Sequence, residues 1–483
     1  MKKQIYNPIF PLNEYVPDGE PHVFGDRVYL YGSHDQENGD RFCMLDYTVW
    51  SAPVTDLSDW TCHGVTYKKS QDPRSQGKTP DKYPAYYAPD CVRGNDGRYY
   101  LYYFTAGPNV KAFGPLSVAV ADKPEGPFEY LGDIRYKDGT PVLKYLTNDP
   151  AVINDNGHIY LYYGWGSGRD FSHKALQPLY RFVLSKLLKR SIKEIKSTRP
   201  CILDCAFIEL EEDMITIKSE PKAVLSSKTS AKKGTQIYNH AFYEAPSIRK
   251  IGDTFYLIYS SGENNELAYA TSKYPDKGFE YRGVIISNSD LGLNGNKEPK
   301  NNSGTIHGGI ECINGQWYVF YHRCTNNTDF SRQACADPIT IENDGTIKQV
   351  EITTQGLNGK PLEAKGKYPA AICCHLYNPN LKRKRGNGNI EKYPCVTFDG
   401  KERIVHGMTK GTKAVYKYFD LRGQKQLIVV AKGKGILSLQ GNEITVYAEN
   451  WQQYRFILQD NGKTALTFEV KKGKIDLREI EFV

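Results

Sequence analysis

Three acidic residues, Asp18, Asp149 and Glu244, have the chemistry needed to hydrolyse a glycosidic bond. Two carboxyl groups on either side of such a bond suffice, because one protonates the leaving group while the other activates water or attacks the sugar directly. A third carboxylate nearby raises the pKa of the acid by like-charge repulsion and keeps it protonated near neutral pH. The alternative is that these residues cap turns or bind a structural ion, since aspartate is common in turns.

The acidic residues stand ahead of a strand that recurs five times. Each copy has a predicted hairpin turn and an aromatic-rich strand: "GDRVYLYGS" from Gly25, "DGRYYLYYF" from Asp96, "NGHIYLYYG" from Asn156, "GDTFYLIYS" from Gly252 and "NGQWYVFYH" from Asn314. Their anchor tyrosines are Tyr29, Tyr100, Tyr160, Tyr256 and Tyr318, at successive spacings of 71, 60, 96 and 62 residues. A unit of roughly 60 residues can hold four short strands and their loops, which is the content of a β-propeller blade.

A polar residue precedes each anchor tyrosine at a similar distance. Counted back from the anchors in chain order, these residues are Asp18 at 11 positions, Asp90 at 10, Asp149 at 11, Glu244 at 12 and His307 at 11. Because equivalent positions of five blades approach one axis, we expect these side chains to converge on one pocket.

The sequence thus predicts an all-β protein, with a five-bladed β-propeller over residues 1–360 and a smaller antiparallel β-sandwich over residues 365–483. A second repeat, "VAVADKPEGPFEYLGDI" from Val118 and "LAYATSKYPDKGFEYRGVI" from Leu267, supports the propeller. The long third interval carries an insertion in which the apolar spacing of Leu184 to Lys196 predicts a surface helix. Alternating segments such as "AVYKYFDL" and "YRFILQ" predict the sandwich.

At the acidic residues the chain resembles glycoside hydrolase family 43, whose members are five-bladed propellers that invert configuration. The resemblance covers roughly residues 5–350 and is carried by "PDGEPHVF", "NDPAVINDNGHIYLYYG" and "YEAPSIRKIGDTFYLIYS". It implies that Asp18 is the general base, Asp149 the residue that modulates the pKa of the acid and orients it, and Glu244 the general acid. Inversion predicts a separation of about 6.5 to 9.5 Å between the carboxyl groups of Asp18 and Glu244.

The resemblance also implies substrate-binding residues, each with a structural alternative. Tyr87 in "YAPD" resembles a sugar-stacking element, His307 in "TIHGG" an axial histidine that contacts substrate or a metal-bound water, and Arg332 an arginine near the acid. Further candidates are Asp90, Asp35 after His34, and Trp165, any of which could equally serve turns or packing. No cofactor is expected to be required, although a structural calcium ion near His307 is a possibility.

One residue departs from the family pattern. Gly19 follows Asp18 where proline is common in the family, but the downstream "HVF" keeps the register. We therefore prefer Asp18 over Glu20 as the base. The C-terminal part resembles family 6-type carbohydrate-binding modules more distantly, in which a sugar-binding role for Trp451 or Tyr454 competes with simple packing against the propeller.

The composition of the chain argues against nucleic-acid and membrane partners. The net charge of +8 is modest for 483 residues, and the basic run "LKRKRG" from Leu381 is expected to be a solvated loop, so no nucleic-acid partner is expected. The 11 cysteines form no CxxC pair, and no apolar run has the length of a signal peptide or a membrane span. We expect a cytoplasmic protein with no membrane partner; its oligomeric state is left open.

These observations predict an inverting exo-glycosidase acting on short oligosaccharides, either a β-xylosidase or an α-L-arabinofuranosidase. Alternatives are a β-galactofuranosidase or another related propeller enzyme, including one that transfers sugar to phosphate or acts on fructosides. A non-catalytic carbohydrate-binding propeller is the alternative from outside the enzymes.

Overall fold

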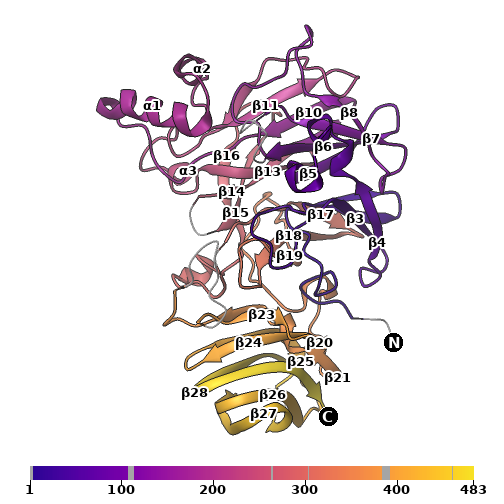
Figure 1. The fold of residues 1–483 in the computed structure, drawn as a ribbon, viewed down its shortest axis with the longest axis vertical. Coiled ribbons are helices and arrows are strands. Elements are labelled where there is room, and N and C mark those ends of the chain that lie inside the picture. The colour runs from indigo at the N-terminus through magenta and orange to yellow at the C-terminus, as the bar shows by residue number, and fades with distance from the viewer. Residues whose placement is uncertain (1–3, 107–113, 263–264, 303, 383–391, 460) are drawn as a thin grey trace.

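The computed structural model describes residues 4–106, 114–262, 265–302, 304–382, 392–459 and 461–483. A five-bladed β-propeller is followed by a further β-sheet region, which confirms the predicted all-β fold (Figure 1). Strands within a blade are antiparallel and follow one another in chain order. Blade one holds β1 (Glu20–Phe24), β2 (Arg27–Tyr31), β3 (Tyr47–Pro53) and β4 (Thr61–Tyr67). Blade two holds β5 (Ala85–Arg93), β6 (Tyr99–Ala106), β7 (Ser117–Ala121) and β8 (Glu129–Asp133).

The remaining blades repeat this plan. Blade three holds β9 (Ala151–Asp155), β10 (His158–Tyr163), β11 (Cys205–Leu210) and β12 (Lys222–Leu225). Blade four holds β13 (Phe242–Ile251), β14 (Thr254–Ser261), β15 (Glu266–Ser272) and β16 (Glu280–Ser287). Blade five has three strands, β17 (Ile310–Ile313), β18 (Gln316–Cys324) and β19 (Arg332–Ile339).

The recurring aromatic strands are the second strands of the blades. Both faces of such a strand are covered by neighbouring blades, so nearly every side chain in them is buried. Tyrosine fits this position because its ring fills the interface while its hydroxyl group finds a partner in the next blade. The hydroxyl groups of Tyr31, Tyr102 and Tyr162 donate to the carbonyl oxygens of Pro124, Met214 and Pro275 at 2.6, 2.9 and 2.6 Å.

The N-terminal segment closes the ring beside blade five. The backbone N–H of Ile9 donates to the carbonyl oxygen of Ala334 at 3.0 Å. The Asn7 side chain donates to the carbonyl oxygen of Ala336 and accepts from its N–H, both at 2.9 Å. Residues from the two ends of the propeller sequence are thus joined, which fixes blade one against blade five.

The insertion in blade three differs from the prediction. Instead of one helix over residues 184–196, two helices occur, α1 (Gln177–Leu188) and α2 (Ile192–Ser197), while α3 (Gln236–Asn239) precedes β13. The break falls at Lys189, whose φ of 51° is left-handed, and Ser191 caps α2 by accepting from the N–H of Glu194. Helices α1 and α2 project from the propeller at the upper left of Figure 1.

The C-terminal strands form one hydrogen-bonded network around a separate apolar core. They are β20 (Leu362–Glu363), β21 (Gly366–Pro369), β22 (His375–Tyr377), β23 (Cys395–Phe398), β24 (Arg403–Thr409), β25 (Lys413–Asp420), β26 (Gln426–Leu439), β27 (Asn442–Ile457) and β28 (Lys463–Phe482). All pairings are antiparallel except that of β20 with β25. The long strand β28 pairs with four of the others and ties the region together.

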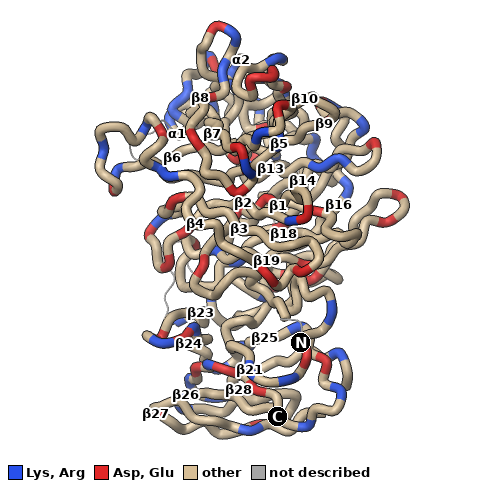
Figure 2. Tube along the Cα trace, turned by 90° about the vertical axis from the view of Figure 1, so that its right-hand side faces the viewer, with Lys and Arg blue, Asp and Glu red and all other residues tan. Residues whose placement is uncertain are grey.

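Surface charge and thiols agree with an ordinary globular protein. Basic and acidic residues are interspersed over both regions (Figure 2). Nine of the cysteines are free thiols: Cys43, Cys62, Cys91, Cys201, Cys205, Cys312, Cys335, Cys373 and Cys374. None of the helices in the described ranges has both the length and the apolar character needed to cross a bilayer.

Candidate active site

The strand register shows which residues of the five blades are equivalent. The residues that pair with the anchor tyrosines are His22, Val92, Ile153, Arg249 and Glu311. Four positions before each of these stand Asp18, Ala88, Asp149, Ala245 and His307. Asp18, Asp149 and His307 are therefore equivalent, as expected. Asp90 and Glu244 are not equivalent to them, because Asp90 lies two positions later in its blade and Glu244 one position earlier.

The backbone turns sharply at the level of these residues. The register shifts beside Glu244 in β13 and between Tyr87 and Asp90 in β5. At these irregularities Ala245 and Ala88 have φ values of 60° and 39°. Asp18 and Asp149 have similar values of 58° and 44°, so four blades turn in the same way at this level. Glu244 stands one position before the turn residue of blade four, which is why its count from the anchor tyrosine is 12 and that of Asp18 is 11.

Asp18 is a buried carboxylate held by cations. Its Oδ1 lies 2.8 Å from Nη1 of Arg332, 3.3 Å from Nδ1 of His322 and 3.9 Å from Nδ1 of His307. Burial alone raises the pKa of Asp18, but Arg332 and His322 outweigh burial and hold that pKa well below its usual value. Asp18 is therefore ionised throughout the physiological pH range.

Glu244 and Asp149 behave in the opposite way. Burial raises the pKa of Glu244, and the negative charge of Asp149 raises it further, to about 8. Burial also raises the pKa of Asp149, to about 6, against the opposing effect of His307. Oδ2 of Asp149 accepts a hydrogen bond of 3.1 Å from the N–H of Ala245, the residue next to Glu244. The two carboxyl groups are thus linked by charge and by backbone.

His307 lies between the carboxylates. Its Nδ1 faces Asp18 at 3.9 Å and its Nε2 faces Oε1 of Glu20 at 3.6 Å. Burial lowers the pKa of His307, but Glu20, Asp149 and Asp18 together raise it to about 9. A protonated His307 adds a positive charge beside three acidic groups.

Arg332 and Asp35 form a unit. Oδ2 of Asp35 accepts from Nε of Arg332 at 2.8 Å, and Oδ1 accepts from Nη2 at 3.1 Å. Because both groups are buried, this two-point contact fixes the guanidinium so that Nη1 reaches Asp18. The Phe42 ring lies 4.6 Å from the guanidinium carbon and covers it. Asp35 therefore acts on Asp18 through Arg332, whereas His34 turns to the carbonyl oxygen of Asp46.

The other predicted residues fall into two groups. The half-buried ring of Tyr87 stacks on Phe104 at 4.9 Å, and Trp165 lies 6.2 Å from the Tyr243 ring. Tyr87 is equivalent to Glu244 by register, and Tyr243, the neighbour of Trp165, directly precedes Glu244. The rings of Tyr87 and Tyr243 therefore lie at the same level of the propeller as Glu244. Asp90 instead lies deeper along the axis, where Oδ1 contacts Nε2 of His22 at 2.6 Å and Oδ2 accepts from Val152.

Gly19, the departure from the family pattern, has a steric explanation. A Cβ atom on Gly19 would lie 3.0 Å from the Leu30 side chain, which is closer than such contacts usually come. Proline occupies the equivalent position in three blades, as Pro89, Pro150 and Pro246, whereas Gly308 occupies it in blade five. The glycine thus accommodates the packing of blade one and leaves the position of Asp18 intact.

Sequence reasoning missed two residues near these carboxyl groups, His322 and Arg249, and considered Glu20 only as the alternative to Asp18 for the base. His322 ends the fifth repeat "NGQWYVFYH", where the equivalent residue in other blades is Ser33, Phe104, Gly164 or Ser260. That unusual histidine was a usable signal. Nothing comparable marked Arg249 in "SIRKI", which has the composition of an ordinary strand end.

The residues around the axis do not suit a calcium ion. Ligand atoms of Glu20, His22 and Asp90 lie within 4.8 Å of one another, but calcium needs six to eight oxygen ligands. Both oxygens of Asp90 already accept hydrogen bonds, and Oε2 of Glu20 accepts from Ser247. Oε1 of Glu20 is the one carboxylate oxygen of this group without a hydrogen-bond partner among the described residues.

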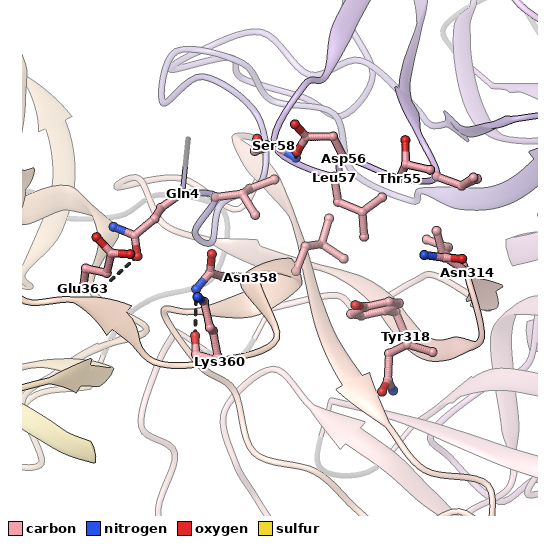
Figure 3. A pocket seen from close by; sticks show the side chains of 15 residues that line it. Gln4, Thr55, Asp56, Leu57, Ser58, Asn314, Tyr318, Asn358, Lys360 and Glu363 are labelled. Atoms are coloured by element: carbon pink, nitrogen blue, oxygen red, sulfur yellow. Dashed lines mark hydrogen bonds between the residues drawn. The ribbon is translucent and has the colours of Figure 1, made fainter. Parts of the chain in front are cut away.

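A separate cavity of about 480 Å³ lies far from these residues (Figure 3). It is lined by the N-terminal segment at Gln4, the loop over residues 54–58 and the blade-five hairpin at Asn314. That hairpin is at the opposite end of β17 from His307. The cavity therefore plays no part in the cluster around Asp18.

The comparisons with known proteins agree with this geometry. The family model described as glycosyl hydrolases family 43 matches residues 5–204 and 197–347. A xylosidase/arabinosidase of Thermoclostridium stercorarium is 41% identical over 90% of this chain and 86% of its own. One from Bacteroides ovatus is 30% identical over 70% of this chain and 95% of its own.

A solved family 43 structure supports the same assignment. The enzyme from Xanthomonas citri, complexed with xylose, is 25% identical and superposes with a TM-score of 0.53 over 74% of this chain and 96% of its own. The match of the family model over most of the chain and the 41% identity over 448 residues leave one conclusion. The chain belongs to glycosyl hydrolase family 43 and is an inverting glycoside hydrolase.

Proposed function

We propose that this enzyme removes terminal β-xylosyl or α-L-arabinofuranosyl residues from short oligosaccharides. The observation that carries the proposal is the difference between two carboxyl groups of one buried cluster. Asp18 is ionised while the pKa of Glu244 is about 8. Inverting hydrolysis needs one carboxylate and one carboxylic acid at the same pH. The names of the two xylosidase/arabinosidase relatives support the choice of sugar.

Glu244 is proposed as the general acid. At neutral pH a group with a pKa of about 8 holds its proton and can deliver it to the glycosidic oxygen as the bond breaks. The leaving group then departs as an alcohol. Positive charge that develops on the sugar ring is stabilised by the ionised Asp18.

Asp18 is proposed as the general base. Arg332, His322 and His307 all approach Oδ1 of Asp18, which leaves Oδ2 as the oxygen to orient a water molecule. The water attacks the anomeric carbon from the face opposite the leaving group, and its proton passes to the carboxylate. Inversion requires space for this water, so the predicted separation of about 6.5 to 9.5 Å between Asp18 and Glu244 belongs to the proposal.

Asp149 is proposed to keep Glu244 protonated. Its charge is the second cause of the raised pKa of Glu244, after burial. Its hydrogen bond to the N–H of Ala245 also fixes the turn that presents the acid. We further propose that Tyr87 and Trp165 stack on sugar rings and that Arg332, held by Asp35, and His307 bind sugar hydroxyl groups. Asp90 is proposed to have a structural role, through its contacts with His22 and with the N–H of Val152 in β9.

The C-terminal strands are proposed to form a separate unit. We propose a boundary between a catalytic part over residues 1–360 and a carbohydrate-binding-module-like part over residues 365–483. Within the latter, Trp451 has Lys432 Nζ at 4.7 Å and the Arg478 guanidinium at 4.1 Å from its ring centre. The OH group of Tyr454 accepts from the N–H of Tyr447 at 3.3 Å. Since both rings are engaged within the strand region, a packing role is favoured over sugar binding.

We propose that the enzyme is located in the cytoplasm and acts on oligosaccharides that the cell has imported. This location is supported by the nine free thiols, a pattern typical of reducing compartments. Neither a nucleic acid nor a membrane is proposed as a partner, and no calcium ion enters the mechanism.

A panel of nitrophenyl glycosides tests the function. β-Xyloside, α-L-arabinofuranoside and β-galactofuranoside are offered to the wild type, Asp18→Asn and Glu244→Gln, and product configuration is followed by NMR. We expect turnover of one or both pentosides with inversion, and large losses in both variants. Activity on none of the three, or variants as active as the wild type, would overturn the proposal.

Two further readouts separate the alternatives. Turnover that requires inorganic phosphate would identify an enzyme that transfers the sugar to phosphate. Preference for the galactofuranoside would identify a β-galactofuranosidase. Xylobiose and arabinose-substituted xylotriose, compared with xylan polymer, test the preference for short chains.

A further inference from the structure

Beneath the proposed catalytic residues, charged side chains fill the centre of the propeller. Two positions before the tyrosine-paired residues stand Glu20, Asp90, Ala151, Ser247 and Gly309, here called the axial ring. The ring is closely packed: Ser247 Oγ donates to Oε2 of Glu20 at 2.8 Å. A Cβ atom on Gly309 would lie 2.5 Å from Ser247 Oγ and 2.7 Å from Oε2 of Glu20. Residues of blades one, four and five therefore meet at the axis.

Arg249 occupies the next level of the same axis. Its guanidinium approaches two carboxylates from different blades: Nη2 lies 3.4 Å from Oε2 of Glu20, and Nε lies 3.5 Å from Oε2 of Glu311. Nη1 donates to the carbonyl oxygen of Ile248 at 2.7 Å, and Nη2 donates to that of Pro21 at 2.5 Å. The side chain is buried. A buried guanidinium with four such contacts is held in a single position.

The contacts continue from Arg249 toward the catalytic level. Oε1 of Glu20 faces Nε2 of His307, and Nδ1 of His307 faces Asp18. Neither Oε1 of Glu20 nor Nε2 of His307 has a hydrogen-bond partner among the described residues, so the ion-pair contact of 3.6 Å between them is the interaction that relates their positions. The position of Glu20, which Arg249 and Ser247 fix through Oε2, therefore determines where His307 lies.

We propose that Arg249 is a built-in cation of the propeller axis, which neutralises Glu20 and Glu311 in place of a divalent metal ion and positions His307 through Glu20. A metal ion would have to compete with the guanidinium for the same carboxylates. Without a cation, the buried carboxylate of Glu20 beside the half-buried carboxylate of Glu311 would be destabilising, so a positive charge is favoured there. Arginine is suited because it remains charged when buried and its planar fork can serve two acceptors at once.

The proposal distinguishes this chain from a metal-dependent enzyme. The catalytic importance of the contact between His307 and Asp18 rests on the proposed function. The role of the Arg249 guanidinium in place of a metal ion does not. Metal binding and thermal unfolding therefore test the proposal even on a protein without measurable glycosidase activity.

The experiment compares the wild type with Arg249→Met, Arg249→Lys and the control Arg98→Met, which alters an exposed arginine paired with Asp122. Each protein is treated with EDTA and then titrated with CaCl2 or MgCl2. Calorimetry measures ion binding, differential scanning fluorimetry measures Tm, and kcat/KM is measured on an aryl pentoside.

We expect the wild type and Arg98→Met to bind no ion and to keep their Tm and kcat/KM in EDTA. Arg249→Met should lose several degrees in Tm and at least about tenfold in kcat/KM, since breaking a buried pair leaves a charge uncompensated. Calcium should bind to this variant and restore part of both losses. Arg249→Lys, which keeps the charge, should be less affected and insensitive to calcium.

Several results would overturn the proposal. One is a wild-type Tm or kcat/KM that falls in EDTA and recovers with calcium, a measurement that needs no variant to fold. Another is an Arg249→Met protein whose folding or activity is the same with and without calcium, whether that level is high or low. Glycosidase failure of the wild type alone, with the ion-binding results as expected, would contradict the proposed function and leave the cation role intact.

Discussion

Two buried histidines face aspartates in this molecule, one in the proposed active site and one where the C-terminal strands meet the propeller. His307 is surrounded by Asp18, Glu20 and Asp149, and although burial lowers its pKa, these carboxylates raise it to about 9. His375 lies 2.9 Å from Oδ2 of Asp290. Burial lowers the pKa of His375 to about 4, which Asp290 does not overcome because Lys417 and Arg323 oppose it.

The difference lies in the balance of charge. At the interface, Lys417 joins Asp290 at 3.3 Å and Glu351 at 2.9 Å, and Arg323 donates to the carbonyl oxygens of Cys373 and Cys374. Lys417 thus pairs with both carboxylates there, and burial of Asp290 is outweighed so that its pKa falls to about 2. In the active site acidic groups outnumber the cations, so a proton is retained on Glu244 at neutral pH. A matched cluster stabilises the fold, whereas a mismatched one supports proton transfer.

The largest effects on activity and stability are expected from replacing Asp18 and Asp290, one at a time, with asparagine, which has nearly the same shape. Asp18→Asn should lower kcat/KM by roughly 10³- to 10⁴-fold because the base is lost, while Arg332 keeps its pairing with Asp35. Asp290→Asn should leave kcat/KM within about twofold and lower the free energy of unfolding by roughly 3 to 5 kcal/mol, because a buried pair is broken. Steady-state kinetics and urea unfolding measure both. An active Asp18→Asn, or an Asp290→Asn of unchanged stability, would erase the contrast between the clusters.

Glu244→Gln should have the next largest effect. We expect kcat/KM to fall by roughly 10²- to 10³-fold on substrates with poor leaving groups, and less on nitrophenyl glycosides, which need little protonation. The unfolding free energy at pH 7 should not fall, since a neutral amide replaces a carboxyl group that is already neutral at that pH. A variant less stable than the wild type would show that Glu244 also supports the fold.

The pH dependence of kcat/KM should show a descending limb near pH 8. Above the pKa of Glu244, about 8, the acid loses its proton and activity falls about tenfold per pH unit. Asp149→Asn removes a charge that raises this pKa, so the limb should move to lower pH and activity at pH 8 should fall. A limb that stays in place would separate Asp149 from the titration of the acid.

The smallest effect concerns stability in acid. His375 has a folded pKa of about 4, below its ordinary value of 6.5, so the unfolded chain binds more protons between these values. Its contribution to stability is present above pH 6.5 and is lost as the pH falls toward 4. His375→Gln should reduce this slope in urea unfolding measured from pH 7 to 4, with kcat/KM unchanged at pH 7. An unaltered slope would mean that other groups cause the acid sensitivity.

Much of the site could be predicted from the sequence because a repeat places equivalent residues at one axis. The anchor tyrosines identified five blades, and Asp18, Asp149 and His307 do occupy one register position. Counting failed for Asp90 and Glu244, because Asp90 stands two positions after Ala88 and Glu244 one position before Ala245, the residues that are equivalent to Asp18. The single helix predicted for residues 184–196 failed because of a left-handed residue at Lys189 that periodicity does not reveal.

By itself the sequence determined the repeat, the all-β architecture and the identity of three acidic residues, because strand periodicity and the spacing of turns are local properties. Only the tertiary structure decided which acid is ionised, since the pKa values of Asp18 and Glu244 depend on Arg332, His322 and Asp149 from three other parts of the chain. It also decided that Arg249 reaches Glu20 and Glu311 across three blades. Electrostatic interactions depend on distance in space, and closure of the propeller brings these residues together.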